Sequence, residues 1–416
     1  MKTLLKVGLG AAIAVAGLAV ASLAAAQTKE VVLGFQTDRT GVTANIGVPV
    51  GTGYNDYVAL VNSKGGVEGY RLKVVEIDNE YKVPPAVEGY ERQKKEGAVI
   101  IGLFGTPHTQ ALTARLAEDK IAGTSPGFGS AASRDGQRYP YLFPVAASYW
   151  SQMAGALQFA KTQLGGNLKG KKIAYIMYDN PAGKEPLPVL EAVAKQEGFD
   201  FRVFAVPPPG VEMGAQILDL TQRYRPDFVV THLFGRAPSV SIKELKRNGY
   251  PLRKVVAMVW GAAEADIDAA GGYGASEGYN TLQFAGVGGD FPVIREILNM
   301  YSAQGKEPPK DMRSSVMYNR GVLTAAIHIE GIRNAIKANG GKPPTGEQVK
   351  VGLENISGFS LGGLVPPLKI TPQDHEGGGW VKVYQVKGGA LQPVGDWFQG
   401  YPAILLQVLE AESKKS

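Results

Sequence analysis

The stretch RLKVVEIDNEYKVPPAVEGYERQKKEGAVIIGLF, residues 71–104, decides the fold. It contains two short apolar runs, Arg71–Ile77 and Ala98–Phe104, on either side of a helical segment that opens at Pro84 and ends before Gly97. Short apolar runs are typical of buried parallel strands, and a helix between two of them makes a strand–helix–strand unit. The stretch therefore predicts an α/β protein built on a parallel sheet.

The same alternation extends along most of the chain. Upstream, Val31–Phe35 is a predicted strand and Gly53–Ser63 a predicted helix. A second block begins at residue 172 and is joined to the first near Phe143–Met153. Its predicted elements are Lys172–Tyr178, Pro186–Glu197, Phe201–Val206, Met213–Tyr224, Asp227–His232, Ser239–Asn248 and Val255–Val259. Two such blocks predict two doubly wound parallel sheets.

The last quarter of the chain has a different pattern. A long apolar helix is predicted over Ser314–Ala338. Three short strands follow, at Leu368–Ile370, Trp380–Val386 and Gln392–Val394. Gly377–Gly379 is predicted to form a hairpin turn between the first two of these strands, because consecutive glycines favour tight turns.

The first 26 residues, MKTLLKVGLGAAIAVAGLAVASLAAA, have the pattern of a signal peptide. Lys2 and Lys6 precede an uncharged stretch, and the small residues Ala24 and Ala26 stand where a signal peptidase requires them. An uncleaved anchor is the alternative, since 20 uncharged residues could span a bilayer, but the stretch is rich in Ala and Gly. We expect cleavage after Ala26 and a periplasmic protein of a double-membraned bacterium.

Composition excludes several kinds of site. The 416 residues include no cysteine, so disulfides, thiolate zinc sites, iron–sulfur clusters and cysteine nucleophiles are excluded. The 44 Lys and Arg residues against 38 Asp and Glu residues give a net charge of +6 that is spread along the chain. Without a basic stripe, no nucleic-acid partner is expected.

Two catalytic motifs are matched only in part. Gly123–Gly127 fits the G-x-S-x-G pattern around Ser125, but Pro126 follows the serine and has no N–H for an oxyanion hole. Gly165–Lys172 resembles a phosphate loop but ends in Lys rather than Ser or Thr, and it precedes a strand instead of following one. We therefore expect no catalytic residues, no cofactor and no enzymatic activity. An exported hydrolase using Ser125 is the least favoured alternative.

The four histidines do not form a metal pair, because no two of them are three or four residues apart. His328 lies in an apolar helical run and is predicted to be structural, and His375 is placed in a turn. His108 and His232 follow predicted strands, where a contact with a ligand and a structural role are both open.

Ligands of open parallel sheets bind beyond the carboxyl ends of the strands. The side chains at these positions are rich in aromatic rings and hydroxyl groups. The first block contributes Thr37, Arg39, Asn45, Phe104, Thr106, His108, Ser125, Phe128 and Ser130, and the second Tyr178, His232, Phe234, Arg236 and Trp260.

The chain resembles the periplasmic solute-binding proteins of ABC importers, in particular the Leu/Ile/Val-binding, type I branch. The resemblance covers nearly the whole mature chain and rests on several segments: Thr40-Gly41 with Asn45-Ile46-Gly47, the helix end Val61–Gly69 with its Asn-x-x-Gly-Gly-Val-x-Gly pattern, Leu72–Asp78, and Ile101-Gly102 leading to Thr106–Gln110. It implies two lobes that close on a ligand and are joined by three crossover strands. Residues 27–147 with 279–357 would form lobe I, and 148–278 with 358–416 lobe II.

The resemblance also implies part of a binding site. The hydroxyl that receives a ligand carboxylate falls on Thr106, a backbone contact near Gly127, and a second hydroxyl near Gly129 or Ser130. An aromatic position falls near Ala182, a departure, and a second one on Phe234. The acidic residue that pairs with an amino group falls near Trp260 or Gly261, where the nearest carboxylate is Glu264.

A buried ammonium without an anionic partner is costly, which argues against an α-amino acid as the ligand. We expect a small aromatic or largely apolar carboxylate, bound by a monomer that delivers it to the membrane subunits of an ABC permease. A branched-chain amino-acid receptor and an amide or urea receptor are the alternatives. The predicted contacts are Asn45, Phe104, Thr106, His108, Ser125, Gly127, Phe128, Ser130, Tyr178, Phe234, Arg236 and Trp260.

Overall fold

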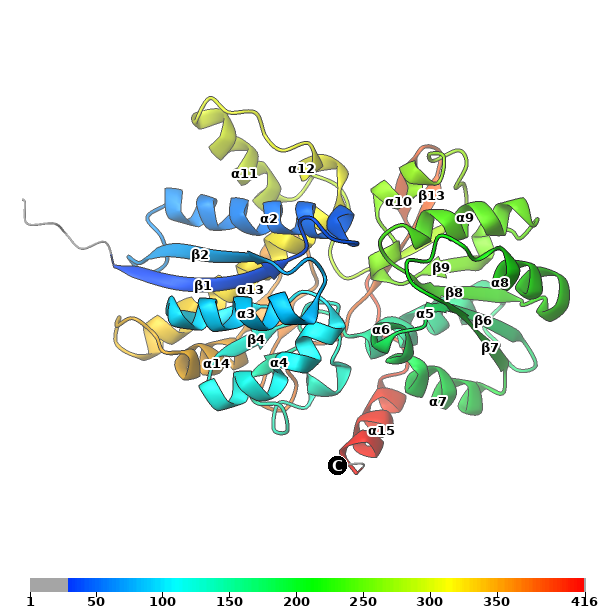
Figure 1. The fold of residues 1–416 in the computed structure, drawn as a ribbon, viewed down its shortest axis with the longest axis horizontal. Coiled ribbons are helices and arrows are strands. Elements are labelled where there is room, and N and C mark those ends of the chain that lie inside the picture. Colours follow the sequence, from blue (N-terminus) through cyan, green and yellow to red (C-terminus); the bar gives the residue numbers. More distant parts are fainter. Residues whose placement is uncertain (1–28, 415–416) are drawn as a thin grey trace, which may run out of the picture.

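The computed structural model describes residues 29–414, which form two α/β lobes lying side by side (Figure 1). The predicted signal peptide, with its cleavage site after Ala26, lies outside the described residues. Within 29–414, no helix combines the length and apolar character that crossing a bilayer requires.

The sheet of the first lobe is parallel throughout and has the order β2-β1-β3-β4-β5. Its strands are β1 (Glu30–Thr37), β2 (Arg71–Asp78), β3 (Ala98–Gly102), β4 (Ala122–Thr124) and β5 (Leu142–Phe143). The chain moves outward from β1 to β2 and then returns past β1 to β3. The carboxyl ends of β1 and β3 therefore border the point where the strand order reverses, which is where such sheets bind ligands.

The sheet of the second lobe has the order β14-β13-β10-β9-β8-β6-β7. Its strands are β6 (Lys172–Tyr178), β7 (Asp200–Val206), β8 (Phe228–His232), β9 (Val255–Ala257), β10 (Asn280–Gln283), β13 (Lys382–Lys387) and β14 (Ala390–Pro393). The pairs among β6 to β10 are parallel, whereas β13 is antiparallel to both β10 and β14. The predicted class, two doubly wound parallel-sheet lobes, is confirmed.

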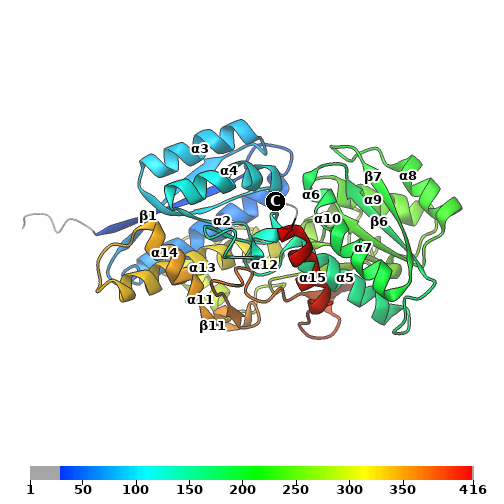
Figure 2. The ribbon, with the colours of Figure 1, turned by 90° about the horizontal axis from the view of Figure 1, so that it is seen from below.

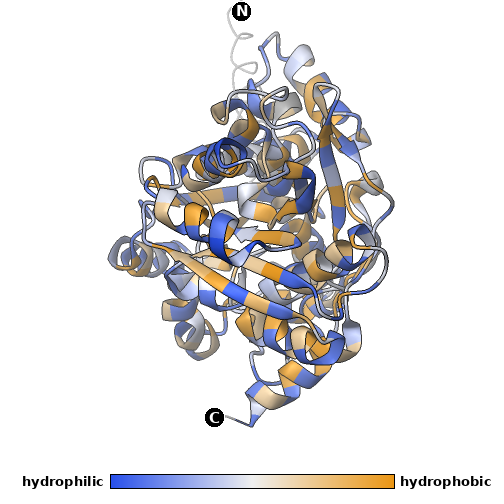
Figure 3. Cartoon of the chain, turned by 90° about the vertical axis from the view of Figure 1, so that its right-hand side faces the viewer, coloured by the Kyte–Doolittle hydropathy of each residue, from blue (hydrophilic) through white to orange (hydrophobic). Residues whose placement is uncertain are grey.

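Helices cover both faces of each sheet (Figures 1 and 2). In the first lobe, α3 and α4 lie on one face and α2, α13 and α14 on the other; in the second, α5, α7 and α15 lie opposite α8, α9 and α10. Figure 3 shows hydrophobic residues along the central strands and mixed surfaces on the helices around them. The helices are α2 (Ala44–Ser63), α3 (Val83–Lys95), α4 (Thr106–Asp119), α5 (Tyr149–Gln163), α6 (Pro181–Lys184), α7 (Leu187–Glu197), α8 (Gly214–Leu218), α9 (Ala237–Arg247), α10 (Glu264–Ala269), α11 (Pro292–Ala303), α12 (Asp311–Ser314), α13 (Val316–Ala338), α14 (Gly346–Glu354) and α15 (Pro402–Ser413).

The chain passes between the lobes three times, at residues 144–148, 284–291 and 370–381. Two expected boundaries differ from this arrangement. Strand β10 pairs with β9 and β13 of the second sheet, so the return to the first lobe comes after residue 283 rather than at 279. His375 bonds to the carbonyl of Leu142 in the first lobe, so the last crossing comes later than 357. We propose 29–143 with 292–369 as lobe I and 149–283 with 382–414 as lobe II.

The glycine run near the third crossing is not a hairpin turn, contrary to prediction. Strand β12 (Leu368–Lys369) pairs with β11 (Ser357–Phe359) in a small sheet of its own, and β13 belongs to the second lobe. Gly377–Gly379 therefore lies in the third crossing, and the hairpin turn is made by Gly388 and Gly389. Consecutive glycines permit a tight turn and a crossing segment equally well, so the pairing partner decides between them.

A buried acid ties the first and third crossings together. The backbone carbonyl of Glu376 accepts a hydrogen bond from the N–H of Ala146 at 2.9 Å, and its fully buried carboxylate accepts one from the N–H of Ser148 at 2.6 Å. The guanidinium of Arg134 pairs with Glu376 at 3.1 Å and with Asp374 at 2.9 Å. These contacts hold the two crossings side by side.

Candidate functional site

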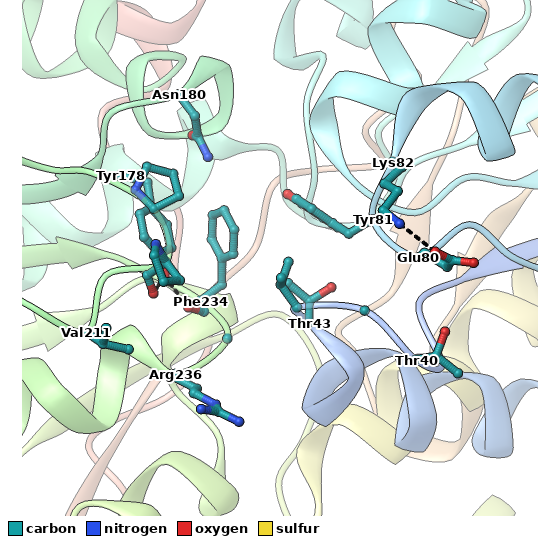
Figure 4. Close-up of a pocket in the computed structure, with 15 residues that line it drawn as sticks. Thr40, Thr43, Glu80, Tyr81, Lys82, Tyr178, Asn180, Val211, Phe234 and Arg236 are labelled. Atoms are coloured by element: carbon teal, nitrogen blue, oxygen red, sulfur yellow. Dashed lines mark hydrogen bonds and ion pairs between the residues drawn. The ribbon is translucent and has the colours of Figure 1, made fainter.

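The two lobes enclose a cavity of about 690 Å³ between the carboxyl ends of their strands. Its walls are loops that follow β1, β2, β6, β7 and β8, as Figure 4 shows for the labelled residues. The lining residues are Thr40, Gly41, Val42, Thr43, Glu80, Tyr81, Lys82, Tyr178, Asn180, Pro208, Pro209, Val211, Phe234, Gly235 and Arg236. The position is the one expected for an open parallel sheet, because backbone donors and loop side chains converge there.

Aromatic rings from both lobes meet at the floor of this cavity. Tyr81 of the first lobe and Phe234 of the second have ring centroids 5.9 Å apart, and Tyr178 lies 4.5 Å from Phe234. The hydroxyl of Tyr178 donates to the carbonyl of Phe234 at 3.0 Å, which holds the two residues together. Figure 4 shows Phe234 and Tyr81 approaching each other from opposite walls. Two apolar side chains stand at the mouth, Val42 and Val211, with exposed fractions of 65% and 44%.

A second aromatic group lies deeper. Phe128 of the first lobe stacks on Trp260 of the second, with centroids 4.4 Å apart and ring planes at 6°. Phe104 meets the edge of Phe128 at 5.3 Å. The indole N–H of Trp260 donates to the carbonyl of Gly127 at 2.6 Å. The space beside these rings is only about 10 Å³, so they are packed against one another across the lobes.

One cation in the cavity wall has a free head group. Arg236 is exposed, and its guanidinium makes no hydrogen bond or ion pair with any residue the structure describes. Other charged and polar groups of the wall are engaged: Thr40 donates to Asp78, and Glu80 pairs with Lys82 at 2.7 Å. In Figure 4, Arg236 extends from the second lobe beside the cavity.

The remaining predicted contacts have different surroundings. Asn45 bridges the lobes, its amide donating to the carbonyl of Gly235 at 3.2 Å. Thr106 begins α4, and its Oγ1 accepts from the N–H of Gly129 at 3.3 Å. His108 is buried against Tyr81, with centroids 5.1 Å apart, and desolvation lowers its pKa. Its ring nitrogens make no hydrogen bond to the described residues.

None of the three predicted hydroxyl residues, Thr106, Ser125 and Ser130, lines the 690 Å³ cavity. The Oγ of Ser125 is buried and makes no hydrogen bond to the described residues, and it is the neighbouring Thr124 that contacts His328, at 2.6 Å. Ser130 is half-buried, and its carbonyl accepts from the hydroxyl of Ser133 at 2.6 Å.

Tyr81 and the buried carboxylate of Glu185 were not predicted from the sequence, whereas Glu264 was named there. Tyr81 follows β2 in a turn with φ of 57°, so a reading of the strand ends could have included it. The carboxylate of Glu185 accepts from the N–H of Ala131 across the lobes, and burial raises its pKa to about 7. Glu264, the acid nearest to the amino-group position, accepts from the N–H of Val316 at 2.9 Å, and burial raises its pKa too. Glu264 thus caps the start of α13.

Comparison with known proteins identifies the family and the fold of the chain. Residues 30–390 match the family model described as "Periplasmic binding protein". A structure from the Pseudomonas fluorescens group, described as an ABC transporter permease, is 31% identical with a TM-score of 0.85, covering 93% of this chain and 97% of its own. No curated protein sequence matches the chain significantly.

Two structures of lower identity share the fold. One is a branched-chain amino-acid ABC transporter protein from Thermus thermophilus with bound valine, 23% identical, with a TM-score of 0.79 and coverage of 92% of this chain and 99% of its own. The other is a fatty acid ABC transporter substrate-binding protein from Thermomonospora curvata, 20% identical, with a TM-score of 0.76 and coverage of 91% and 94%.

Proposed function

Because this chain belongs to the periplasmic binding protein family, we propose that it is the substrate-binding component of an ABC importer and takes a small aromatic or largely apolar carboxylate. Proteins of this kind bind small ligands and deliver them to permease subunits. The ligand class is argued from the cavity, since relatives with the same fold are described with ligands as different as valine and fatty acids.

One observation carries the proposal: the cavity combines aromatic faces with a single unpaired guanidinium. Its volume of about 690 Å³ is in the range of small-molecule sites. Tyr81, Tyr178 and Phe234 offer ring surfaces for an apolar body. Arg236 has donors to spare, and guanidinium groups bind carboxylates through two parallel hydrogen bonds. A planar acid could lie on the rings with its carboxylate at Arg236.

The carboxylates near the cavity favour this class over α-amino acids. Glu80 is already paired with Lys82, and Glu264 caps the backbone of α13. Among the described residues that line the cavity, Glu80 is the one carboxylate, and a buried ammonium group there would have to compete with Lys82 for it.

Binding would draw the lobes together by hinge motion at the three crossings. The contact of Asn45 with Gly235 at 3.2 Å and the pairing of Tyr81 with Phe234 join opposite walls, so both would form on closure. The permease would then recognise the closed form.

The test is a ligand screen by thermal shift and isothermal titration calorimetry. Benzoate, cinnamate, hexanoate, leucine, benzamide and urea are compared, since a ligand at 100 times its Kd stabilises a protein by about 2.7 kcal/mol. We expect an aromatic acid to bind more tightly than its amide. Leucine or urea binding more tightly than every acid would overturn the proposed ligand class.

Arg236→Gln tests the carboxylate contact. A hydrogen bond to a charged group contributes about 1.5–3 kcal/mol, so the variant should weaken binding of the aromatic acid by at least about tenfold. Arg247→Gln, on the same helix region but paired with Glu244 and outside the cavity, is the matched control and should bind like the wild type. Equal affinities for all three proteins would remove Arg236 from the site.

A further inference from the structure

Glu185 reaches from the second lobe into the first. It lies between α6 and α7, where its backbone carbonyl accepts the indole N–H of Trp150 at 3.0 Å. Its Oε1 accepts a hydrogen bond from the backbone N–H of Ala131 in the first lobe. Its Oε2 is buried and makes no hydrogen bond to the described residues. The carboxylate is therefore anchored on the opposite lobe by one oxygen only.

The first lobe has a cradle shaped for this carboxylate, formed by Thr106, Gly129 and Ala131. A Cβ atom at Gly129 would lie 2.0 Å from Oε2 of Glu185 and 2.7 Å from Cγ2 of Thr106. Only the absence of a side chain at residue 129 leaves room for the carboxylate. Thr106 accepts the N–H of Gly129 at 3.3 Å, and its hydroxyl also contacts that of Tyr149 in the second lobe, so its proton becomes free for another acceptor when the lobes part.

No cation of the described chain neutralises Glu185. The neighbouring Lys184 pairs with Asp179 at 2.7 Å, and Glu185 itself makes no ion pair with the described residues. A buried carboxylate with one partner loses more hydration than a single hydrogen bond returns. The elevated pKa of Glu185, about 7 through burial, agrees with this imbalance.

The cradle and the carboxylate belong to different lobes, so they separate when the lobes open. Opening removes Glu185 from the N–H of Ala131 and exposes this donor, together with the hydroxyl of Thr106, to the cleft. Two groups that can donate to a carboxylate are then free on the first lobe. An external carboxylate that occupies the cradle would meet Glu185 when the lobes close, and two carboxylates repel each other there.

We propose that Glu185 is a specificity-determining residue: its carboxylate fills the cradle of Thr106, Gly129 and Ala131 in the closed protein and excludes ligands whose own carboxylate would bind there. The inference rests on the proposed function, since it takes the cleft as the ligand site. It also explains why the ligand carboxylate would bind at Arg236. With the cradle filled by Glu185, the ligand carboxylate must pair with a different donor.

The experiment compares wild type, Glu185→Ala and Glu185→Gln, each titrated by calorimetry at pH 8 with leucine and hexanoate. Glu185→Ala empties the cradle and should bind at least one of these probes at least tenfold more tightly than the wild type. Glu185→Gln is the matched control: its amide oxygen still accepts the N–H of Ala131 and fills the same volume, so it should exclude the probes as the wild type does.

A third variant locates the gained binding. Proline at residue 131 removes the N–H, and the preceding Ser130 has φ of −97° and ψ of 124°, a conformation that proline tolerates after it. The double variant Glu185→Ala/Ala131→Pro should lose the gain. Unchanged affinity of Glu185→Ala for both probes would overturn the inference, as would a gain that survives in the double variant.

The outcomes separate this inference from the proposed function. A wild type that binds no aromatic acid contradicts the proposed ligand class whatever Glu185→Ala does. A wild type that binds an aromatic acid through Arg236, with no gain in Glu185→Ala, contradicts only the role of Glu185. If Glu185→Ala does not fold, Glu185→Ser provides a second route, because its short side chain also leaves the cradle empty and should show the same gain for these probes.

Discussion

At the scale of single residues, Trp260 illustrates how much a strand-end position can and cannot reveal. Its place after β9 predicted a cleft residue, and the structure places it at the inner wall of the cleft. Its partners could not be inferred: it stacks on Phe128 of the other lobe and lies 4.9 Å from the buried guanidinium of Arg320. Both partners are distant in the chain, so only the closed arrangement of the lobes brings them together.

Trp260→Ala is predicted to weaken ligand binding by more than about 1 kcal/mol, roughly fivefold, because it removes the aromatic contact across the lobes. Trp260→Phe keeps a ring but loses the hydrogen bond to Gly127, so its ligand affinity should lie between those of the wild type and Trp260→Ala. Calorimetry with the ligand from the screen measures the effect, and Trp397→Ala, outside the cavity, is the control. An affinity unchanged in Trp260→Ala would exclude it from recognition.

Two histidines also show which surroundings the sequence can and cannot predict. His328 was predicted to be structural, and this is confirmed: it lies buried between the hydroxyl of Tyr54 at 2.8 Å and that of Thr124 at 2.6 Å. The apolar helical run around it was sufficient evidence. His375 was placed in a turn, but the structure buries it on Phe143 at 3.8 Å with Glu354 at 3.0 Å. A residue in a crossing segment has no periodic neighbours to indicate burial.

At the scale of elements, α2 was predicted to begin at Gly53 and begins at Ala44. Its first half contains Pro49 and three glycines, a composition that indicates a loop. Packing explains the difference: a Cβ at Gly53 would lie 2.1 Å from the carbonyl of Tyr318, and one at Gly321 would lie 2.0 Å from that of Val50. The glycines let α2 and α13 approach closely, and this contact offsets their low helix propensity.

The loop at Gly235 is predicted to control closure. Gly235 has φ of 65°, and a Cβ there would lie 2.9 Å from the carbonyl of Val42 on the opposite lobe. Gly235→Ala should therefore weaken ligand affinity by about tenfold, and small-angle scattering should show a more open protein with ligand present.

The control for this prediction is Gly249→Ala. Gly249 has a similar φ of 74° but no atom within 4 Å of the position of a Cβ. Both variants have the same backbone strain, which costs on the order of 1 kcal/mol in stability. Only Gly235→Ala should also lose affinity; equal losses in both would attribute the effect to strain instead of closure.

At the scale of the whole molecule, buried histidines and buried carboxylic acids make opposite contributions to the pH dependence of the unfolding free energy. Burial lowers the pKa of His232 and His328 to about 3 and raises that of Glu185 and Asp266 to about 7. Below pH 6.5 the unfolded histidines bind protons that the folded ones do not, so acid destabilises the fold. The folded acids hold protons that the unfolded acids release above about pH 4.5, so acidification from pH 7 stabilises it.

Glu185→Gln should change how the unfolding free energy depends on pH. The wild type takes up a proton at Glu185 as the pH falls from 7 towards 4.5, and the variant cannot. Relative to the variant, the unfolding free energy of the wild type should rise by up to about 1.4 kcal/mol per pH unit in this range. The neighbouring Tyr149 and Tyr175 do not interfere, because burial raises their pKa values further.

Urea unfolding at pH 5, 6 and 7.5 measures the difference. His328→Gln is the control of opposite sign: its deficit relative to the wild type should shrink on acidification, because the wild type loses the contribution of a neutral buried histidine. A difference between wild type and Glu185→Gln that does not vary with pH would show that Glu185 is ionised in both folded and unfolded protein.

The sequence by itself determined the class of this protein, two parallel-sheet lobes with a cleft at the strand ends, because hydrophobic periodicity and strand–helix alternation are local properties. It also placed Tyr178 and Phe234 at the cleft, since they stand where strands end, but not Tyr81. The tertiary structure decided which lobe β10 joins, where Glu376 ties the crossings, and that Glu185 crosses to Ala131. These contacts join residues far apart in the chain, and their free energy depends on burial that no local pattern encodes.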